Sequence, residues 1–126
     1  MLARRAAKLP AIIVVGEAPT ITDFLYRHLY QRPYAIVTAQ LPSHVMRLLD
    51  QRRIPLVVCD DSTPRMRSFE LMGEIKQRSP QTHVVLVVLS GSPDQERRAR
   101  AAGADTYVSS VFACKRLQIL LDELLS

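Results

Sequence analysis

Short apolar runs that alternate with segments of helical periodicity are the feature of this sequence that most limits its fold. Five runs have the length and composition of strands buried on both faces of a sheet. They are Ala11–Val15, Ala35–Ala39, Leu56–Cys59, Val84–Leu89 and Thr106–Val108. Apolar residues recur at helical spacing after each run, which predicts helices over 21–29, 42–53, 69–78, 93–102 and 113–124. This alternation predicts a parallel sheet, because parallel neighbours need a crossover connection.

Turn residues predict where several of these helices begin and end. We expect Thr20 or Thr22 to cap the first helix and Ser43 the second, because hydroxyl side chains accept hydrogen bonds from first-turn N–H groups. Pro93 is expected to start the fourth helix and Gly103 to stop it.

The fold expected from this pattern is α/β, a flavodoxin-like (βα)5 three-layer sandwich around a parallel five-stranded sheet. The strand order 2-1-3-4-5 follows by analogy with open doubly wound sheets and from right-handed crossovers. With 126 residues, we expect a single domain over 11–126 after a basic N-terminal tail over 1–10.

The positive charge of the chain is concentrated in that tail. Arg4, Arg5 and Lys8 account for three of the five excess positive charges, so the rest is close to neutral. The best remaining basic cluster, around Arg97 and Arg98, has acidic neighbours and is expected to be a solvated helix face. Nucleic acid is therefore not an expected partner of this domain alone.

The expected location of the protein in the cell follows from three kinds of pattern that the sequence lacks. No apolar run is long enough to span a bilayer, and the apolar stretch near the N-terminus is too short for a secretory signal. Cys59 and Cys114 show no disulfide or metal-ligand spacing. We therefore expect a cytoplasmic protein without a membrane partner.

Polar residues that follow the strands are the candidates for a functional site, because ligands of open parallel sheets bind beyond the carboxyl ends of the strands. Glu17 follows the first strand, Asp60 the third, Ser90 the fourth and Ser110 the fifth. Glu17 and Asp60 leave the two central strands, so their carboxylates are expected to converge. Two carboxylates with a carbonyl oxygen and waters would suit Mg²⁺.

Three segments, taken together with their order along the chain, make the sequence resemble the receiver domain of two-component response regulators. Asp60-Asp61-Ser62-Thr63-Pro64 is similar to the family's phospho-acceptor turn, and Ser90-Gly91 to its Thr/Ser-Ala/Gly step. The segment Ala102–Tyr107 looks like the family's Gly-Ala-Asp-x-Tyr motif. The resemblance covers nearly the whole chain.

The resemblance implies a mechanism. Asp60 would take a phosphoryl group from a phosphohistidine of a sensor histidine kinase, with Mg²⁺ held by Asp60, Glu17 and the carbonyl of Ser62. Ser90 would bond a phosphoryl oxygen, and Tyr107 would act as the switch aromatic. The face from the fourth helix to the fifth would bind the kinase or another signalling protein, and a homodimer through it is left open.

The sequence also departs from the family. One acidic residue, Glu17, follows the first strand where the family has two, and Ser110-Val111 stands where the family has Lys-Pro. Losing the lysine removes a charge-assisted bond to the phosphoryl group; Arg65 or Arg67 could replace the charge. We therefore expect a degenerate receiver, a protein-interaction module with a weakened site and weak or absent Mg²⁺ binding. A functional phospho-accepting receiver is the alternative.

An enzyme is not expected. The Gly16-Glu17-Ala18-Pro19 segment provides one glycine and so no phosphate-binding loop, and no nucleophile elbow is visible.

Overall fold

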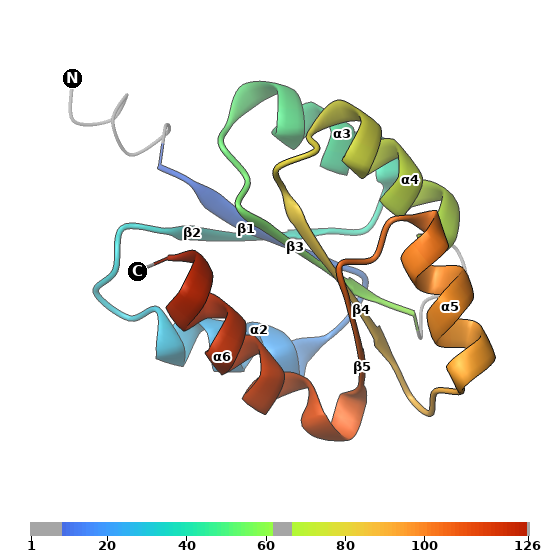
Figure 1. The fold of residues 1–126 in the computed structure, drawn as a ribbon. Helices are drawn as coiled ribbons and strands as arrows, with labels where there is room; N and C mark the ends of the chain where they lie inside the picture. Colours follow the sequence, from blue (N-terminus) through green and yellow to red (C-terminus); the bar gives the residue numbers. More distant parts are fainter. Residues whose placement is uncertain (1–8, 62–66, 126) are drawn as a thin grey trace.

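Five parallel strands form one sheet in the order β2-β1-β3-β4-β5, which confirms the predicted topology. This arrangement is seen in a computed structural model that describes residues 9–61 and 67–125 (Figure 1). The strands are β1 (Ala11–Val15), β2 (Ala35–Ala39), β3 (Leu56–Asp60), β4 (His83–Val88) and β5 (Thr106–Ser109).

Helices cover both faces of the sheet. The helices are α2 (Pro19–His28), α3 (Pro42–Gln51), α4 (Ser68–Arg78), α5 (Pro93–Ala102) and α6 (Ala113–Leu124), with a short 3₁₀ turn η2 (Ser110–Phe112) before the last. Helices α2 and α6 lie on one face, and α3, α4 and α5 lie on the other (Figure 1). The predicted three-layer sandwich is therefore confirmed.

Strand alternation divides the core between the two faces. In β1, Ile12 and Val14 pack in the cluster under α2 and α6, whereas Ile13 and Val15 pack in the cluster under α3, α4 and α5. All four side chains are buried, which is why the run has no polar position. The same alternation decides which way each side chain points where a strand ends.

The predicted caps of the first two helices are wrong. Helix α2 begins with Pro19 after Ala18, and the Thr22 hydroxyl donates to the Ala18 carbonyl at 3.1 Å instead of accepting from a first-turn N–H. Helix α3 begins with Pro42 after Leu41, which makes no side-chain cap. Proline suits a first turn because its fixed φ is helical and it has no N–H to satisfy.

The predicted ends of α5 are confirmed. Ser92 caps the helix by accepting a hydrogen bond from the Gln95 N–H at 3.1 Å, Pro93 opens it, and Gly103 follows its last residue with φ 131. The expected arginine face is exposed and internally paired: Asp94 contacts Arg97 at 3.1 Å and Arg98 at 3.3 Å.

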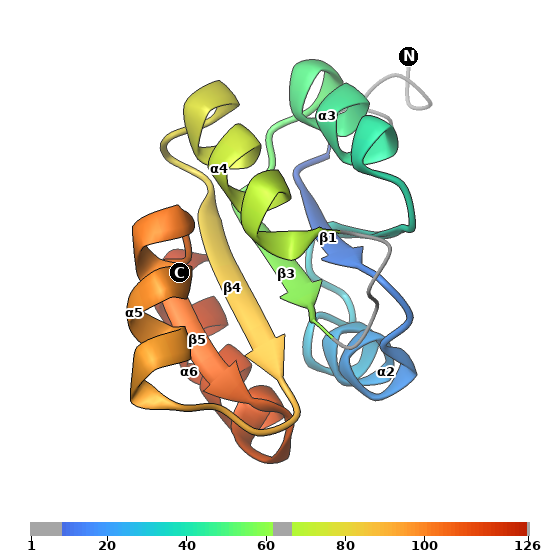
Figure 2. The same cartoon turned by 90° about the vertical axis from the view of Figure 1, so that its right-hand side faces the viewer.

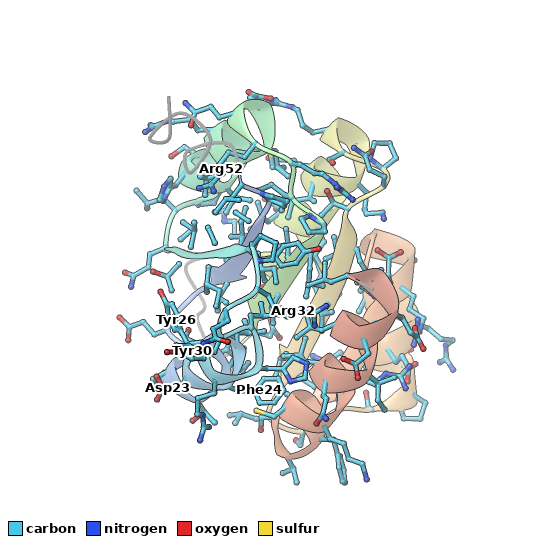
Figure 3. All side chains as sticks on the ribbon, turned by 90° about the vertical axis from the view of Figure 1, so that its left-hand side faces the viewer. Asp23, Phe24, Tyr26, Tyr30, Arg32 and Arg52 are labelled. Carbon is cyan, nitrogen blue, oxygen red and sulfur yellow. The ribbon has the colours of Figure 1, made fainter. Side chains whose placement is uncertain are left out.

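Two arginines connect distant parts of the chain through backbone carbonyls. Arg32 donates to the Leu125 carbonyl at 3.2 Å, and Arg52 donates twice to the Leu9 carbonyl, at 2.6 and 3.1 Å. Figure 3 shows Arg32 beside the C-terminal helix and Arg52 near the top of the view. Within the described ranges, every helix is too short or too polar to traverse a bilayer.

Candidate functional site

The carboxyl ends of β1, β3, β4 and β5 border a pocket of about 360 Å³, which we call the Asp60 pocket. Figure 2 shows the arrowheads of these strands directed to the same end of the sheet. The lining residues come from the strand ends, the start of α2 and the start of α6: they are Glu17, Ala18, Pro19, Thr20, Ile21, Asp60, Val87, Leu89, Ser110, Val111 and Cys114.

Asp60 reaches this pocket because of its place in β3. Leu56 and Val58 pack under α2 and α6, so Asp60, two positions further on, points to the same face. Cys59 packs on the opposite face, and Asp61 is not among the described pocket residues. Of the two adjacent acids, Asp60 therefore lines the pocket, whereas Asp61 is not among its described lining residues.

The cysteine before Asp60 has no part in the pocket chemistry. Burial, together with a smaller effect of the nearby Asp61 charge, raises the pKa of the fully buried Cys59 thiol to about 12. A thiol of that acidity stays protonated at neutral pH and is a poor nucleophile or metal ligand.

Glu17 is brought to the same pocket by a tight turn. Gly16 has φ 97, a conformation that glycine adopts without strain, and its N–H donates to the Ala39 carbonyl at 2.9 Å. The turn leaves Glu17 exposed at the pocket edge and lets α2 begin two residues later. The structure thus brings Glu17 and Asp60 together, as the sequence predicts.

Two of the three residues predicted to bind Mg²⁺ line the Asp60 pocket. Glu17 and Asp60 supply two carboxylates, and the third predicted ligand, the Ser62 carbonyl, lies outside the described residues. Among residues 9–61 and 67–125, no group of three or more His, Cys, Asp or Glu side chains is placed to hold a metal ion. The donor set is compatible with Mg²⁺, which often binds through one or two carboxylates and retains several waters.

At the end of β4, an apolar residue occupies the pocket wall. The strand ends at Val88, one residue earlier than predicted, so the first residue beyond it is Leu89. Leu89 lines the pocket with 74% of its surface exposed, whereas Ser90 is exposed and is not one of the lining residues described. The sequence predicts Leu89 as the last residue of this strand because it continues an apolar run.

At the end of β5, a serine and an apolar residue form the wall. Ser110, at the family's lysine position, lines the pocket together with Val111, which is 81% exposed, and Cys114. No Lys or Arg is found among the lining residues in the described part of the chain. The sequence does not predict Leu89 or Cys114 as pocket residues, since no spacing distinguishes an apolar wall residue from a core residue.

Of the two arginines suggested as a replacement for the lysine, the structure describes Arg67. Arg67 is 76% exposed, and its guanidinium lies 3.7 Å from the Glu70 carboxylate. It is not a lining residue. Arg65 lies outside the described residues.

Tyr107 lies on the other face of the sheet, against α5. Its hydroxyl donates to the Gln95 side-chain carbonyl at 2.6 Å and accepts from the Ser92 N–H at 3.3 Å. A Cβ at Gly91 would overlap the same hydroxyl, so the absence of a side chain at 91 is what makes room for the ring. Tyr107 is half-buried and packs with the core under α3, α4 and α5, apart from the Asp60 pocket.

The chain matches known proteins over most of its length. A family model described as the response regulator receiver domain matches residues 12–122. The heme response regulator HssR of Staphylococcus aureus (strain N315) is 27% identical over 105 residues, which cover 83% of this chain and 46% of that protein. A probable cyclic di-GMP phosphodiesterase of Vibrio cholerae is 29% identical over 99 residues, 77% of this chain and 22% of that protein.

Solved structures agree on the fold. The signal receiver domain of an HD domain-containing protein from Pseudomonas fluorescens Pf-5 superposes with a TM-score of 0.75 at 24% identity, covering 94% of this chain and 95% of that one.

The chain spans less than half the length of HssR and of the probable phosphodiesterase. The family match and the strand-end pocket that contains Asp60 lead to one conclusion: this chain belongs to the response regulator receiver domain family, the receiver domains of two-component signalling.

Proposed function

We propose that this receiver domain acts mainly as a signalling protein-interaction module whose phosphorylation site is weakened. The observation that carries the proposal is the composition of the Asp60 pocket. Glu17 and Asp60 supply two carboxylates, and the wall residues Leu89, Ser110 and Val111 supply one hydroxyl and no cation.

The absence of a cation among the described lining residues determines how far phosphorylation of Asp60 would be weakened. A phosphoryl group on Asp60 would add about 1.5 to 2 negative charges beside the Glu17 carboxylate. A charge-assisted hydrogen bond of the kind a lysine makes contributes about 1.5–3 kcal/mol. Without it, the equilibrium occupancy of the phosphorylated state falls roughly ten- to hundredfold.

The same argument applies to Mg²⁺. When bound, the ion would neutralise charge on the phosphoryl oxygens. In this chain Glu17 and Asp60 would hold it, with the Ser62 carbonyl suggested by the family resemblance. We propose that a site with two carboxylates and apolar walls binds Mg²⁺ weakly.

The face made by α5, β5 and α6 is the proposed docking surface for a signalling partner such as a sensor histidine kinase. Phe112 and Ile119 are exposed there, at 63% and 45%, and they line a groove of about 200 Å³ with Val108, Lys115 and Arg116. An apolar groove beside two cations suits a partner segment with apolar and acidic side chains. A homodimer is the other occupant to test for.

We propose no enzymatic activity for this domain. The relative named as a phosphodiesterase matches over 22% of its length, so its activity is not transferred to this chain.

The test is a phosphodonor assay read by intact mass. Wild-type protein incubated with acetyl phosphate and Mg²⁺ should gain little or no phosphoryl group. Ser110→Lys should gain measurably more, because it returns the cation to the pocket, and adding Asp60→Asn to Ser110→Lys should abolish the gain. Rapid, complete labelling of wild-type protein that Asp60→Asn removes would refute the proposal.

That outcome would establish the second candidate function, a phospho-accepting receiver supplied by a histidine kinase. This candidate is supported by Glu17 and Asp60 lining one pocket. A Mg²⁺ titration separates the two candidates independently. Weak or undetectable binding fits the interaction module, and tight binding that Glu17→Gln abolishes fits the phospho-acceptor.

A further inference from the structure

We propose that two copies of this chain associate through the outer edge of β2, with their β2 strands paired antiparallel in one continuous sheet. This surface is separate from the face of α5, β5 and α6 proposed above for a signalling partner. The inference goes beyond the proposed function and does not depend on it.

The outer edge of β2 is open to pairing. Within residues 9–61 and 67–125, β2 is the terminal strand of the sheet, and β1 is the one strand that pairs with it. The Ala35 N–H donates to the Pro10 carbonyl at 2.9 Å, and the Ala39 carbonyl accepts from the Gly16 N–H at 2.9 Å. These two hydrogen bonds show which residues of β2 direct their backbone groups to β1.

The backbone groups of β2 that face away from β1 form a self-complementary set. The residues that alternate with Ala35 and Ala39 are Ile36 and Thr38 at the outer positions, so their N–H and carbonyl groups point away from the sheet. The open edge therefore has two donors and two acceptors, placed symmetrically about Val37. Antiparallel pairing centred on Val37 sets Ile36 opposite Thr38 of the partner copy, and each such pair exchanges both of its hydrogen bonds.

Charge favours a second copy at this edge. Strands at the edge of a sheet usually carry charged side chains or proline, which discourage pairing. The sequence has no charged side chain between Arg32 and His44, and β2 has no proline. A chain with a net charge of +5 repels its own copies, so an uncharged edge is where two copies can meet with the least repulsion.

The opposite edge of the sheet is less suited to a second copy. β5 has four residues where β2 has five, and Val108 of β5 lines a groove with Lys115 and Arg116. Pairing of two β5 strands would bring these cations of both copies close together, and like charges in such positions are destabilising. β2 is therefore the edge that fits a second copy.

Exposed tyrosines on α2 extend the proposed contact. Leu25 and Leu29 of α2 share one core cluster with Ile36 of β2, so the helix lies over this edge of the sheet. On its outer side, Tyr26 and Tyr30 are 56% and 76% exposed. Figure 3 shows both tyrosines at the left of the view, with the C-terminal helix at the right. A two-fold axis through the β2 pair places both copies of α2 on the same face of the joined sheet, where these rings can pack across the junction.

Sedimentation equilibrium of the full chain tests the association. The average mass should rise from that of a monomer towards that of a dimer between about 20 µM and 1 mM, as expected for a small interface. A mass that stays monomeric over this range would overturn the inference.

Amide hydrogen exchange identifies the edge that pairs. Over the same concentration range, exchange of the Ile36 and Thr38 N–H groups should slow roughly tenfold, because pairing removes them from water. The Val37 N–H faces β1 and should be protected at both concentrations. Exchange rates of Ile36 and Thr38 that do not change when the dimer forms would overturn the inference.

Two variants of one exposed residue test the pairing. Thr38→Pro should weaken dimerisation roughly tenfold or more, since each dimer loses two hydrogen bonds. Proline is tolerated where the N–H of an edge strand faces solvent, so the monomer should still fold. Thr38→Lys keeps the N–H and adds a charge, and it should weaken dimerisation to a similar extent. Undiminished dimerisation of both variants would refute pairing through β2.

A control variant and a salt series separate this edge from the face of α5, β5 and α6. Phe112→Ser removes an exposed apolar side chain from that face and should leave dimerisation within about twofold of wild type. Raising the salt from about 0.05 M to about 0.5 M should strengthen the dimer, because it screens the repulsion between two positive chains. Loss of the dimer in Phe112→Ser, or a dimer that weakens with salt, would assign the contact to another surface and overturn the inference.

Discussion

The Tyr107 hydroxyl donates a hydrogen bond of 2.6 Å to the Gln95 side chain, so a residue of β5 is fixed to the first turn of α5. The ring can lie there because position 91 carries no side chain. The Tyr107 hydroxyl also accepts from the Ser92 N–H, so the tyrosine connects the β4–α5 loop to the proposed partner-binding face. Tyr107, Ser92 and Gln95 are not among the described lining residues of the Asp60 pocket.

Gly91→Ala should displace the Tyr107 ring and destabilise the fold by up to about 1 kcal/mol, the net contribution of the lost hydrogen bond. Tyr107→Phe, which removes the same hydrogen bond, should destabilise the fold by a similar amount. Urea unfolding measures both, and the Gln95 side-chain amide resonances report the lost contact. Gly73→Ala is the control: its Cβ would meet the Ala102 carbonyl at an ordinary 3.5 Å, and alanine in α4 should stabilise by about 0.5–1 kcal/mol. Unchanged Gln95 resonances in Gly91→Ala would contradict the prediction.

Asp105→Ala should lower the free energy of unfolding more than the removal of an exposed ion pair with the same nitrogen–oxygen distance. The Asp105 carboxylate accepts from Lys76 at 2.9 Å and from the N–H of the buried Val84 at 2.9 Å. Losing the acceptor of a buried N–H costs about 1–3 kcal/mol. Asp50→Ala, which removes the exposed 2.9 Å pair with Arg78, should cost less than about 1 kcal/mol. Equal shifts of the two urea midpoints would argue against this ranking.

Stability should fall as the pH drops below about 6.5, in part because of His83. Burial lowers the pKa of His83 from its ordinary 6.5, opposed in part by the Asp105 charge, and its Nε2 lies 2.8 Å from the Thr106 hydroxyl. The folded state therefore binds the proton less readily than the unfolded state, so stability present above pH 6.5 is lost as the pH falls.

Urea unfolding at pH 7.5 and pH 5.5 checks this sign. The difference in unfolding free energy between the two pH values should shrink in His83→Gln. His44→Gln controls for the loss of one histidine. If the unfolding free energy of His83→Gln depended on pH as strongly as that of the wild type, His83 would not contribute to the pH dependence of stability.

One thiol should react in the native protein and two after unfolding. Cys59 is fully buried with its pKa raised to about 12, whereas Cys114 is half-buried at the Asp60 pocket. Titration with a disulfide reagent at pH 8 should count one thiol, and Cys114→Ser should reduce that number to none. Rapid reaction of a second thiol without denaturant would mean that β3 opens in the native state.

Local patterns in the sequence were sufficient to predict the helices and strands of the fold. Runs such as Ala11–Val15 have no polar position because both sheet faces are covered, so the strands could be recognised from composition alone. The caps predicted at Thr20 or Thr22 and at Ser43 failed because α2 already begins at Pro19 and α3 at Pro42, which places these hydroxyl side chains inside the helices and not on the residue before them.

The candidate site could be predicted only in part. Glu17, Asp60 and Ser110 share one pocket, as expected for residues at the carboxyl ends of parallel strands. Leu89, and not Ser90, lines the same pocket, because β4 leaves the sheet one residue earlier than its apolar run suggests. One residue of register moves a side chain to the other face of a strand.

The sequence by itself determined the order of strands and helices along the chain, the class of fold and the pocket positions of Glu17, Asp60 and Ser110, since these depend on local periodicity and chain direction. The tertiary structure alone decided that two adjacent acids differ in position, that Leu89 and Val111 form the pocket walls, and that Tyr107 binds Gln95. Those facts depend on where each strand ends against its neighbours, which is a property of packing that no local pattern encodes.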